Sequence, residues 1–167
     1  NDELISLEPW IVNSEWNEKL PKLNELREKV KNMGFWLPQV SKEYGGLGLS
    51  LEQHGEVSEI LGASPYGFYV FNCQAPDAGN MEVLIDTGTE EQKEQYLYPL
   101  LEGKIRSCFA MTEPQYAGSN PTRMGTTAKK ENKNYIINGH KWFTSSFDGA
   151  NFAIVMVVTD PDGEDVP

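Results

Sequence analysis

The segment CFAMTEPQYAGSN, residues 108–120, combines residue types that could bind a large, partly polar ligand. It starts as an apolar strand and then breaks at Thr112-Glu113-Pro114, which supplies a hydroxyl group, a carboxyl group and a rigid turn residue. Three small residues, 117–119, follow after a short spacer. Because a turn alone needs only the proline and one glycine, three small residues predict that something bulky lies close to the backbone there.

The composition argues against several other kinds of site. The 167-residue chain has a net charge of −11, whereas a nucleic-acid groove needs clustered lysine and arginine. His54 and His140 have no paired cysteines or acids at ligand spacing, so no metal site is expected. Cys73 and Cys108 lie far apart in apolar contexts and are interpreted as buried free thiols. No apolar run reaches the length of a membrane span, and the start NDELISLEPW does not resemble a signal peptide.

Helical periodicity dominates the first two-thirds of the sequence. A stripe of apolar residues at helical spacing between Leu20 and Met33 predicts one helix. Pro21 suits the first turn of this helix, and Gly34 suits its C-terminal cap. The stretch 71–88 is rich in small and apolar residues and predicts a more buried helix.

Two further helices have capping signals at their starts. Ser50 with Gln53 forms a candidate capping box, and Thr89 with Gln92 forms another. The helix that opens at Thr89 is expected to end at Gly103.

The periodicity changes after Lys104. The segments IRSCFAM, GTTAKKEN, NYIINGHKWFTSS and NFAIVMVVTD are predicted to be strands, with turns within ENKN and at Asn138-Gly139. The run from Phe152 to Val158 has no polar residue and is expected to be buried on both faces. Three or four strands can neither close a barrel nor complete a sandwich, so the sequence is interpreted as a piece of a longer protein.

Four segments, in the family's own order, resemble the acyl-CoA dehydrogenases. YGGLGLSLEQHGEVSEILG and GTEEQKEQYLYPLLEGK are similar to two stretches of their helical domain, and FAMTEPQYAGSN and YIINGHKWFTSS are similar to their two flavin-binding segments. FNCQAPDAGNMEVL is most similar to the branch that in animals is fused to phosphotransferase-like domains. The resemblance covers the chain from about Leu20 onward.

The resemblance implies an α+β fold. An all-α N-terminal domain over residues 1–104 would be followed, over residues 105–167, by the first strands of an antiparallel β-barrel-like middle domain. In the family, FAD lies between this middle domain and a C-terminal helical bundle, which the sequence lacks.

The resemblance also implies a flavoprotein oxidoreductase of fatty acid β-oxidation. In the family a carboxylate removes the α-proton of an acyl-CoA thioester while flavin N5 takes the β-hydride. That carboxylate comes from the C-terminal bundle, beyond Pro167, so no catalytic residue is expected here and the fragment alone should be inactive. Glu113, beside Pro114, is expected to be a structural acid.

The first flavin segment carries over five candidate residues. Phe109, Met111 and Thr112 would lie along the flavin, with Thr112 bonded to its pyrimidine edge. Gly118 and Ser119 would let the backbone approach the pyrophosphate and the CoA arm, and the Ser119 hydroxyl would reach both cofactor and substrate.

The second flavin segment allows two registers. Counting from the preceding turn places the flavin-stacking aromatic residue at Phe143 and the N5-bonding hydroxyl at Ser145, whereas matching by residue type selects Trp142 and Thr144. Neighbours on a strand point to opposite faces, so only one pair can face the flavin. The turn is expected to fix the register, which favours Phe143 and Ser145.

One helix is a candidate wall for the acyl chain. In the family the helix that matches residues 71–88 lines the acyl tunnel, and here Ala75 and Gly79 would leave room for a chain. Asn80 could then contact an oxygenated acyl chain. Alternatively, Asn80 satisfies buried backbone groups or faces water.

Two alternatives to the dehydrogenase stay open. A flavin monooxygenase or oxidase of the same fold would share these motifs and differ in the C-terminal carboxylate region and in its reactivity with oxygen. A non-catalytic binding module would be natively short and stable as an apo-monomer. The dehydrogenase itself implies acyl-CoA as substrate, an electron-transfer flavoprotein as acceptor and a homo-oligomer. It would be cytoplasmic in a bacterium and mitochondrial or peroxisomal in a eukaryote.

Overall fold

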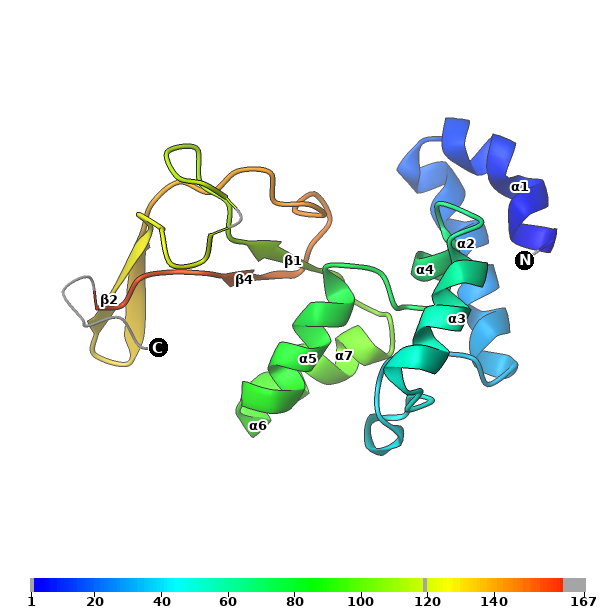
Figure 1. The fold of residues 1–167 in the computed structure, drawn as a ribbon, viewed down its shortest axis with the longest axis horizontal. Coiled ribbons are helices and arrows are strands. Elements are labelled where there is room, and N and C mark those ends of the chain that lie inside the picture. The colour runs from blue at the N-terminus through cyan, green and yellow to red at the C-terminus, as the bar shows by residue number, and fades with distance from the viewer. Residues whose placement is uncertain (1, 119, 161–167) are drawn as a thin grey trace. The chain divides into compact units, whose positions relative to one another are not determined.

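The computed structural model describes residues 2–118 and 120–160 of the chain. The chain forms two compact units that divide between Lys104 and Ile105, and each is described by itself. The first unit is helical, and the second contains the strands (Figure 1).

The helical unit is an ordered series of short and medium-length helices. They are α1 (Asp2–Asn13), α2 (Trp16–Asn32), the 3₁₀ helix η1 (Lys42–Tyr44), α3 (Leu51–Leu61), α4 (Gly67–Val70), α5 (Asp77–Thr87), α6 (Glu90–Gln92), the π-helix η2 (Lys93–Leu97) and α7 (Tyr98–Leu101). The last three follow one another directly and form one helical stretch. In the described part of the chain, no helix has the length and apolar character that crossing a membrane requires.

Helix α2 begins earlier than the sequence pattern predicts. Its first residue is Trp16, and the carboxylate of Glu18 accepts a hydrogen bond from the backbone N–H of Glu15 at 3.3 Å. Pro21 therefore lies inside the helix, and its assignment to the first turn is wrong. The acidic pair caps the helix one turn before the apolar stripe starts. The predicted end is confirmed, because Gly34 follows the helix with a left-handed φ of 75°.

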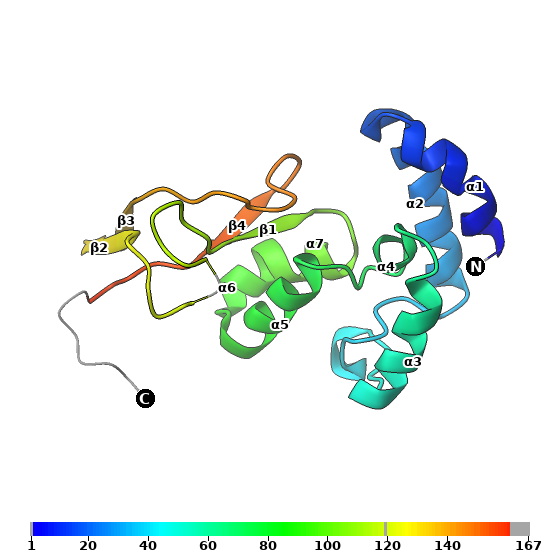
Figure 2. The same cartoon turned by 45° about the horizontal axis from the view of Figure 1, so that its top comes forward.

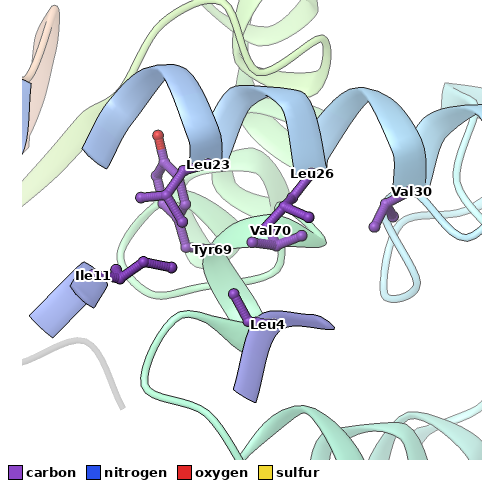
Figure 3. Packing of buried hydrophobic residues seen from close by; sticks show 7 residues of the cluster. All are labelled: Leu4, Ile11, Leu23, Leu26, Val30, Tyr69 and Val70. Carbon is purple, nitrogen blue, oxygen red and sulfur yellow. The ribbon is translucent and has the colours of Figure 1, made fainter. Parts of the chain in front are cut away.

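The core of the helical unit is built from α1, α2 and α4. Figure 3 shows its main residues, which are Leu4, Ile11, Leu23, Leu26, Val30, Tyr69 and Val70. The three residues from α2 confirm the predicted stripe from Leu23 to Val30, whereas Met33 at its predicted end follows the helix and is exposed. Full burial of a side chain such as leucine or valine contributes about 1.5–3 kcal/mol. This stripe therefore holds α2 against its two partners.

A buried arginine connects segments of the helical unit that are distant in sequence. Arg27 is only 3% exposed, and its guanidinium group donates to the carbonyl oxygen of Tyr69 at 3.0 Å and to Asn72 Oδ1 at 3.2 Å. The Asn72 amide donates in turn to the carbonyl oxygen of Leu100 at 3.0 Å. The Arg27 guanidinium also lies over the ring of Trp36. A buried charge needs such a set of partners because it has lost its hydration.

Both predicted capping boxes are confirmed. Ser50 Oγ accepts from the Gln53 N–H at 3.2 Å, and Gln53 Oε1 accepts from the Ser50 N–H at 3.0 Å. Thr89 and Gln92 make the same reciprocal pair at 3.2 and 2.9 Å. Gly103, with a φ of 72°, follows the end of the helical stretch as predicted. These helix ends are set by local side chains.

The buried helix predicted within residues 71–88 is shorter than expected. Helix α5 begins only at Asp77, and Pro76 before it lacks an N–H and disfavours a helical backbone at Ala75. Asn72 lies further upstream with a positive φ of 57° and bonds to the end of α7. The residues before α5 therefore form no helical turn, and Asn72 among them makes buried hydrogen bonds to the end of α7.

The second unit contains two pairs of strands. Strand β1 (Ser107–Ala110) pairs in parallel with β4 (Phe152–Val155), and β2 (Thr127–Glu131) pairs in antiparallel with β3 (Asn134–Asn138) (Figure 2). The hairpin turn falls at Asn132-Lys133, as predicted. The parallel pairing of β1 with β4 corrects the expectation of purely antiparallel strands. A parallel pair needs a long crossover, which the segment between these two strands provides.

The expected turn at Asn138-Gly139 does not form. Strand β3 ends at Asn138, and residues 139–144 have no regular secondary structure. The backbone of Gly139 passes so close to Thr126 that a Cβ on Gly139 would lie 2.2 Å from Thr126 Oγ1. The chain directly after β3 therefore passes against the residue that precedes β2.

The apolar run from Phe152 to Val158 is not buried on both faces, so that expectation is wrong. Only its first part forms β4, Ala153 is exposed, and the remaining residues of the run are half-buried. The physical reason is that, within the described residues, β1 is the only strand that flanks β4 in its sheet.

Replacing Arg27 with methionine should lower the free energy of unfolding of the helical unit by about 2–4 kcal/mol, because buried acceptors lose their charged donor. Urea unfolding followed by far-UV circular dichroism measures this loss. Lys29→Met on the same helix is the matched control: Lys29 makes an exposed ion pair with Glu3, and such a pair contributes about 0–1 kcal/mol. Equal losses in both variants would contradict the role assigned to Arg27.

Candidate functional site

The end of β1 positions the first three candidate residues. Phe109 lies within β1 and is half-buried, and Met111 and Thr112 follow directly after the strand, also half-buried. The N–H of Met156 donates to the carbonyl oxygen of Ala110 at 3.0 Å, which holds the strand end in place. The backbone therefore leaves the sheet at Met111 and Thr112 from a fixed point.

Glu113 is a buried carboxylate that organises the following loop. It is 3% exposed, its Oε2 accepts from the Gly125 N–H at 2.6 Å, and its Oε1 accepts from the Thr126 N–H at 2.9 Å. The expectation of a structural acid is confirmed by these bonds.

Lys141 is the counter-ion of Glu113. Its Nζ lies 2.8 Å from Glu113 Oε1, and the two side chains are 11% and 3% exposed. The same ammonium donates to the carbonyl oxygen of Met111 at 2.8 Å and lies 3.7 Å from Met124 Sδ. Lys141 belongs to the second candidate segment, and its side chain contacts the first.

The ion pair keeps the Glu113 carboxyl group charged. Burial raises the pKa of this group, but the hydrogen bonds from Lys141, Thr126 and Gly125 lower it by more. The net result is a pKa of about 2, below the ordinary value of 4.5. Glu113 is therefore ionised at neutral pH and is a poor proton acceptor there.

A backbone hydrogen bond completes the junction between the two candidate segments. The N–H of Trp142 donates to the carbonyl oxygen of Thr112 at 3.0 Å, next to the bond from Lys141 to Met111. The carbonyl oxygens of two neighbouring residues in the first segment are thus both bonded to the second segment. We call this arrangement the junction.

Within the second candidate segment, residues 142–145 do not form a strand, so the expected alternation of faces does not apply. Phe143 has a positive φ of 49°, and its ring centroid lies 4.7 Å from that of Trp142. Phe143 is 81% exposed and Trp142 is 41% exposed. Thr144 is half-buried and Ser145 is exposed. The expectation that only one of the two residue pairs can face the flavin assumed a strand here, and that assumption is wrong.

Gly118 packs directly against Thr112. A Cβ on Gly118 would lie 2.5 Å from Thr112 Cγ2, so an internal contact accounts for glycine at this position. The same loop brings Tyr116 over Gly125, where a Cβ would lie 2.6 Å from the Tyr116 ring. Ser119, which is predicted to contact cofactor and substrate, lies outside the described residues.

Asn80, the candidate for contact with an acyl chain, belongs to the helical unit. It lies in α5 and is 1% exposed, and Asp77 on the preceding turn is also buried. The Gln74 amide donates to Asp77 Oδ2 at 2.5 Å. This burial is compatible with both readings of Asn80, as a residue that satisfies interior polar groups and as one that lines a ligand site.

Sequence reasoning missed Lys141, although a signal for it exists. Lysine is rarely buried, so the segment GHKWFT does not by itself suggest a buried partner. However, Lys141 is the only lysine or arginine within residues 134–160, and Glu113 is the only acid within residues 103–130. A single acid in one stretch and a single cation in another are a usable signal for a buried ion pair.

The described residues contain no group of three or more His, Cys, Asp or Glu side chains placed to hold a metal ion. Cys73 and Cys108 are free and buried, which confirms their interpretation as buried thiols. Burial raises the pKa of the Cys73 thiol to about 12, so this group is a poor nucleophile at neutral pH.

Comparison with known proteins decides the family. The profile of the acyl-CoA dehydrogenase N-terminal domain matches residues 6–104, and that of the middle domain matches residues 108–166. The chain belongs to the acyl-CoA dehydrogenase family. Acyl-CoA dehydrogenase family member 10 of Mus musculus is 46% identical over 149 residues, which are 84% of this chain and 14% of that protein. The resemblance to the animal branch is thereby confirmed.

Solved structures of this acyl-CoA dehydrogenase family share the fold. An acyl-CoA dehydrogenase homologue from Mycobacterium abscessus matches with a TM-score of 0.82 and 40% identity, over 97% of this chain and 40% of that one. A glutaryl-CoA dehydrogenase from Mycobacterium smegmatis in complex with FADH2 matches with a TM-score of 0.65 and 26% identity, over 95% and 42%. The predicted α+β fold is confirmed, and the chain spans less than half the length of these structures.

Glu113 should make the β unit sensitive to acid. Its folded pKa of about 2 lies below the ordinary 4.5, so the folded unit binds fewer protons than the unfolded chain. Its contribution to stability is then complete above pH 4.5 and is lost as the pH falls toward 2. The expected result for Glu113→Gln is lower stability at neutral pH and a flatter pH profile over this range.

The indole NMR signal of Trp142, the only tryptophan after Lys104, reports the unfolding of this unit. Glu131→Gln, at an exposed position in β2, is the control and should keep the wild-type profile. Parallel pH profiles for Glu113→Gln and wild type would refute the prediction.

Proposed function

We propose that the chain is part of an FAD-dependent acyl-CoA dehydrogenase and supplies one wall of its flavin site. The junction is the observation that carries this proposal. Two segments that resemble the family's flavin-binding segments are joined there through the carbonyl oxygens of Met111 and Thr112. Family membership supports the same reading.

The residues around the junction suit a flavin ring. The isoalloxazine ring has apolar faces and a polar pyrimidine edge, so it needs both aromatic cover and hydrogen-bond partners. Phe143 and Trp142 offer exposed aromatic surface. The Thr112 hydroxyl makes no hydrogen bond to any described residue and is able to engage a polar edge. Phe109 and Met111 add apolar side chains beside it.

The exposure of the second segment supports one of the two registers. Phe143 is almost fully exposed, whereas the backbone N–H of Trp142 is bonded within the junction. Ser145 is exposed and Thr144 is half-buried. In this proposal Phe143 covers a face of the ring and Ser145 offers a hydroxyl group. Gly118 and Ser119 would then lie toward the pyrophosphate.

Bound FAD would accept the hydride in the α,β-dehydrogenation of an acyl-CoA thioester. The residues of this chain would bind and orient the ring, and the aromatic pair would keep water from one face. Glu113 cannot serve as the general base, because its carboxylate is bonded to Lys141, Gly125 and Thr126 and its pKa is about 2. In this proposal the base comes from the C-terminal helices of the family.

The remaining parts of the proposal concern substrate and partners. Asn80 would line the acyl-chain end of the substrate site. The full-length protein would pass electrons to an electron-transfer flavoprotein and form a homo-oligomer. It would act in the bacterial cytoplasm, or in mitochondria or peroxisomes of a eukaryote.

Phe143→Ala in the full-length protein should weaken FAD binding about tenfold, since the loss of an aromatic contact of about 1.4 kcal/mol corresponds to that factor. Titration of the apoprotein with FAD, followed by flavin fluorescence, gives the Kd. Tyr135→Ala in β3 removes another exposed aromatic side chain and is the matched control. Equal Kd values for Phe143→Ala and wild type would reject the assignment of Phe143.

Residues 1–167 alone should not oxidise acyl-CoA, because the proposed base lies in the C-terminal helices. A dye-linked assay with short-chain and long-chain acyl-CoA and added FAD tests this, with heat-treated protein as the blank. Turnover above the blank would show that the base lies within these residues.

A further inference from the structure

We propose that Glu113 and Lys141 are positioning residues of the flavin site: their buried ion pair sets the separation of the two segments that the ring would contact. This inference rests on the proposed function. Neither side chain is assigned a contact with the flavin, so both act through Met111, Thr112 and Trp142.

The ion pair supplies most of the hydrogen bonds that join the two segments. Lys141 donates to Met111 and to Glu113, both in the first segment and both at 2.8 Å. Without Lys141 Nζ, the bond from Trp142 to Thr112 would be the only remaining hydrogen bond described between residues 111–113 and 139–145. Loss of the pair therefore leaves the segments linked at a single point.

The bonding of both charged groups leaves little freedom of movement. The Glu113 carboxylate accepts from Gly125, Thr126 and Lys141. The Lys141 ammonium has three contacts, of which Glu113 and Met111 are oxygen acceptors and Met124 Sδ is the third. Since a lysine ammonium has three N–H donors, this set matches its capacity. A shift of either segment would strand a buried charge.

The pair also sets the polarity of the first segment. Lys141 donates a hydrogen bond to the carbonyl oxygen of Met111, and the Trp142 N–H donates one to that of Thr112. The Thr112 hydroxyl is left as the polar group for a ligand edge. Removal of Lys141 frees an acceptor beside this hydroxyl, so both the geometry and the polarity of the wall change.

A merely structural pair and a positioning pair predict different results. If the pair only stabilises the fold, its loss lowers the melting temperature, and variants that remain folded bind FAD normally. If it positions the wall, folded variants bind FAD more weakly, and the environment of the bound ring changes. The spectrum of the flavin is therefore the deciding readout.

The test uses the full-length protein with the variants Lys141→Met, Lys141→Arg and Glu113→Gln, at a temperature where circular dichroism shows each to be folded. Lys129→Met, at an exposed position in β2, is the control. We expect the Kd for FAD to rise at least about tenfold in Lys141→Met and Glu113→Gln, with a changed visible circular dichroism band of the bound flavin. Such a factor corresponds to about 1.4 kcal/mol. Lys141→Arg, which keeps the charge and its donors, should recover most of the affinity, and Lys129→Met should match wild type.

Lys141→Met leaves Glu113 buried without a counter-ion, and this variant could fail to fold for that reason alone. In that case the double variant Glu113→Gln/Lys141→Met takes the place of Lys141→Met. The double variant should bind FAD no more weakly than Lys141→Met, since that single change already breaks the ion pair that Glu113→Gln removes. Folded variants with wild-type Kd and wild-type flavin bands would overturn the inference and leave the proposed function intact. Failure of the wild-type protein to bind FAD would overturn the proposed function as well.

Discussion

The buried ion pair of Glu113 and Lys141 is the constraint on which the candidate site depends. Transfer of a carboxylate and an ammonium from water costs several kcal/mol per ion, and this cost is offset only when their remaining hydrogen-bonding capacity is satisfied. Here the partners come from the end of β1, from Gly125 and Thr126, and from the segment after β3. Any arrangement that separated these segments would leave a buried charge unpaired, so the pair favours one path of the chain.

The helical unit uses a buried cation in a comparable way. Arg27 joins α2 to the connection before α5, and through Asn72 to the end of α7. The apolar stripe of α2 supplies three of the seven main core residues, but it does not direct the irregular connections. Directional hydrogen bonds from a charged group do so, because they tolerate little displacement. In each unit, taken by itself, apolar contacts hold the regular elements and a buried charge holds the irregular segments.

This division explains which parts of the structure could be predicted. The capping boxes at Ser50 and Thr89 and the stripe of α2 depend on neighbours within one or two turns, so the sequence pattern was sufficient. The path after β3 depends on the approach of Gly139 to Thr126 and on the pairing of Lys141 with Glu113. Those contacts join residues far apart in the sequence, and periodicity contains no information about them. The same holds for the parallel pairing of β1 with β4. For the candidate site, the sequence motifs predict which residues belong to it, but they do not predict the hydrogen bonds that join its two segments.

The proposed flavin wall offers groups that could contact the ring, but it does not enclose the ring. A ligand pocket usually buries about 70–90% of the ligand surface, and one wall covers a single face of a flat ring. Phe143 is 81% exposed, so its ring offers contact area but no surrounding pocket. A second wall must therefore come from protein beyond the junction. The homologue from Mycobacterium abscessus is long enough to contain such a second wall, because this chain matches only 40% of its length. On this reading the junction fixes where the ring lies, and the opposing wall determines how tightly it is held.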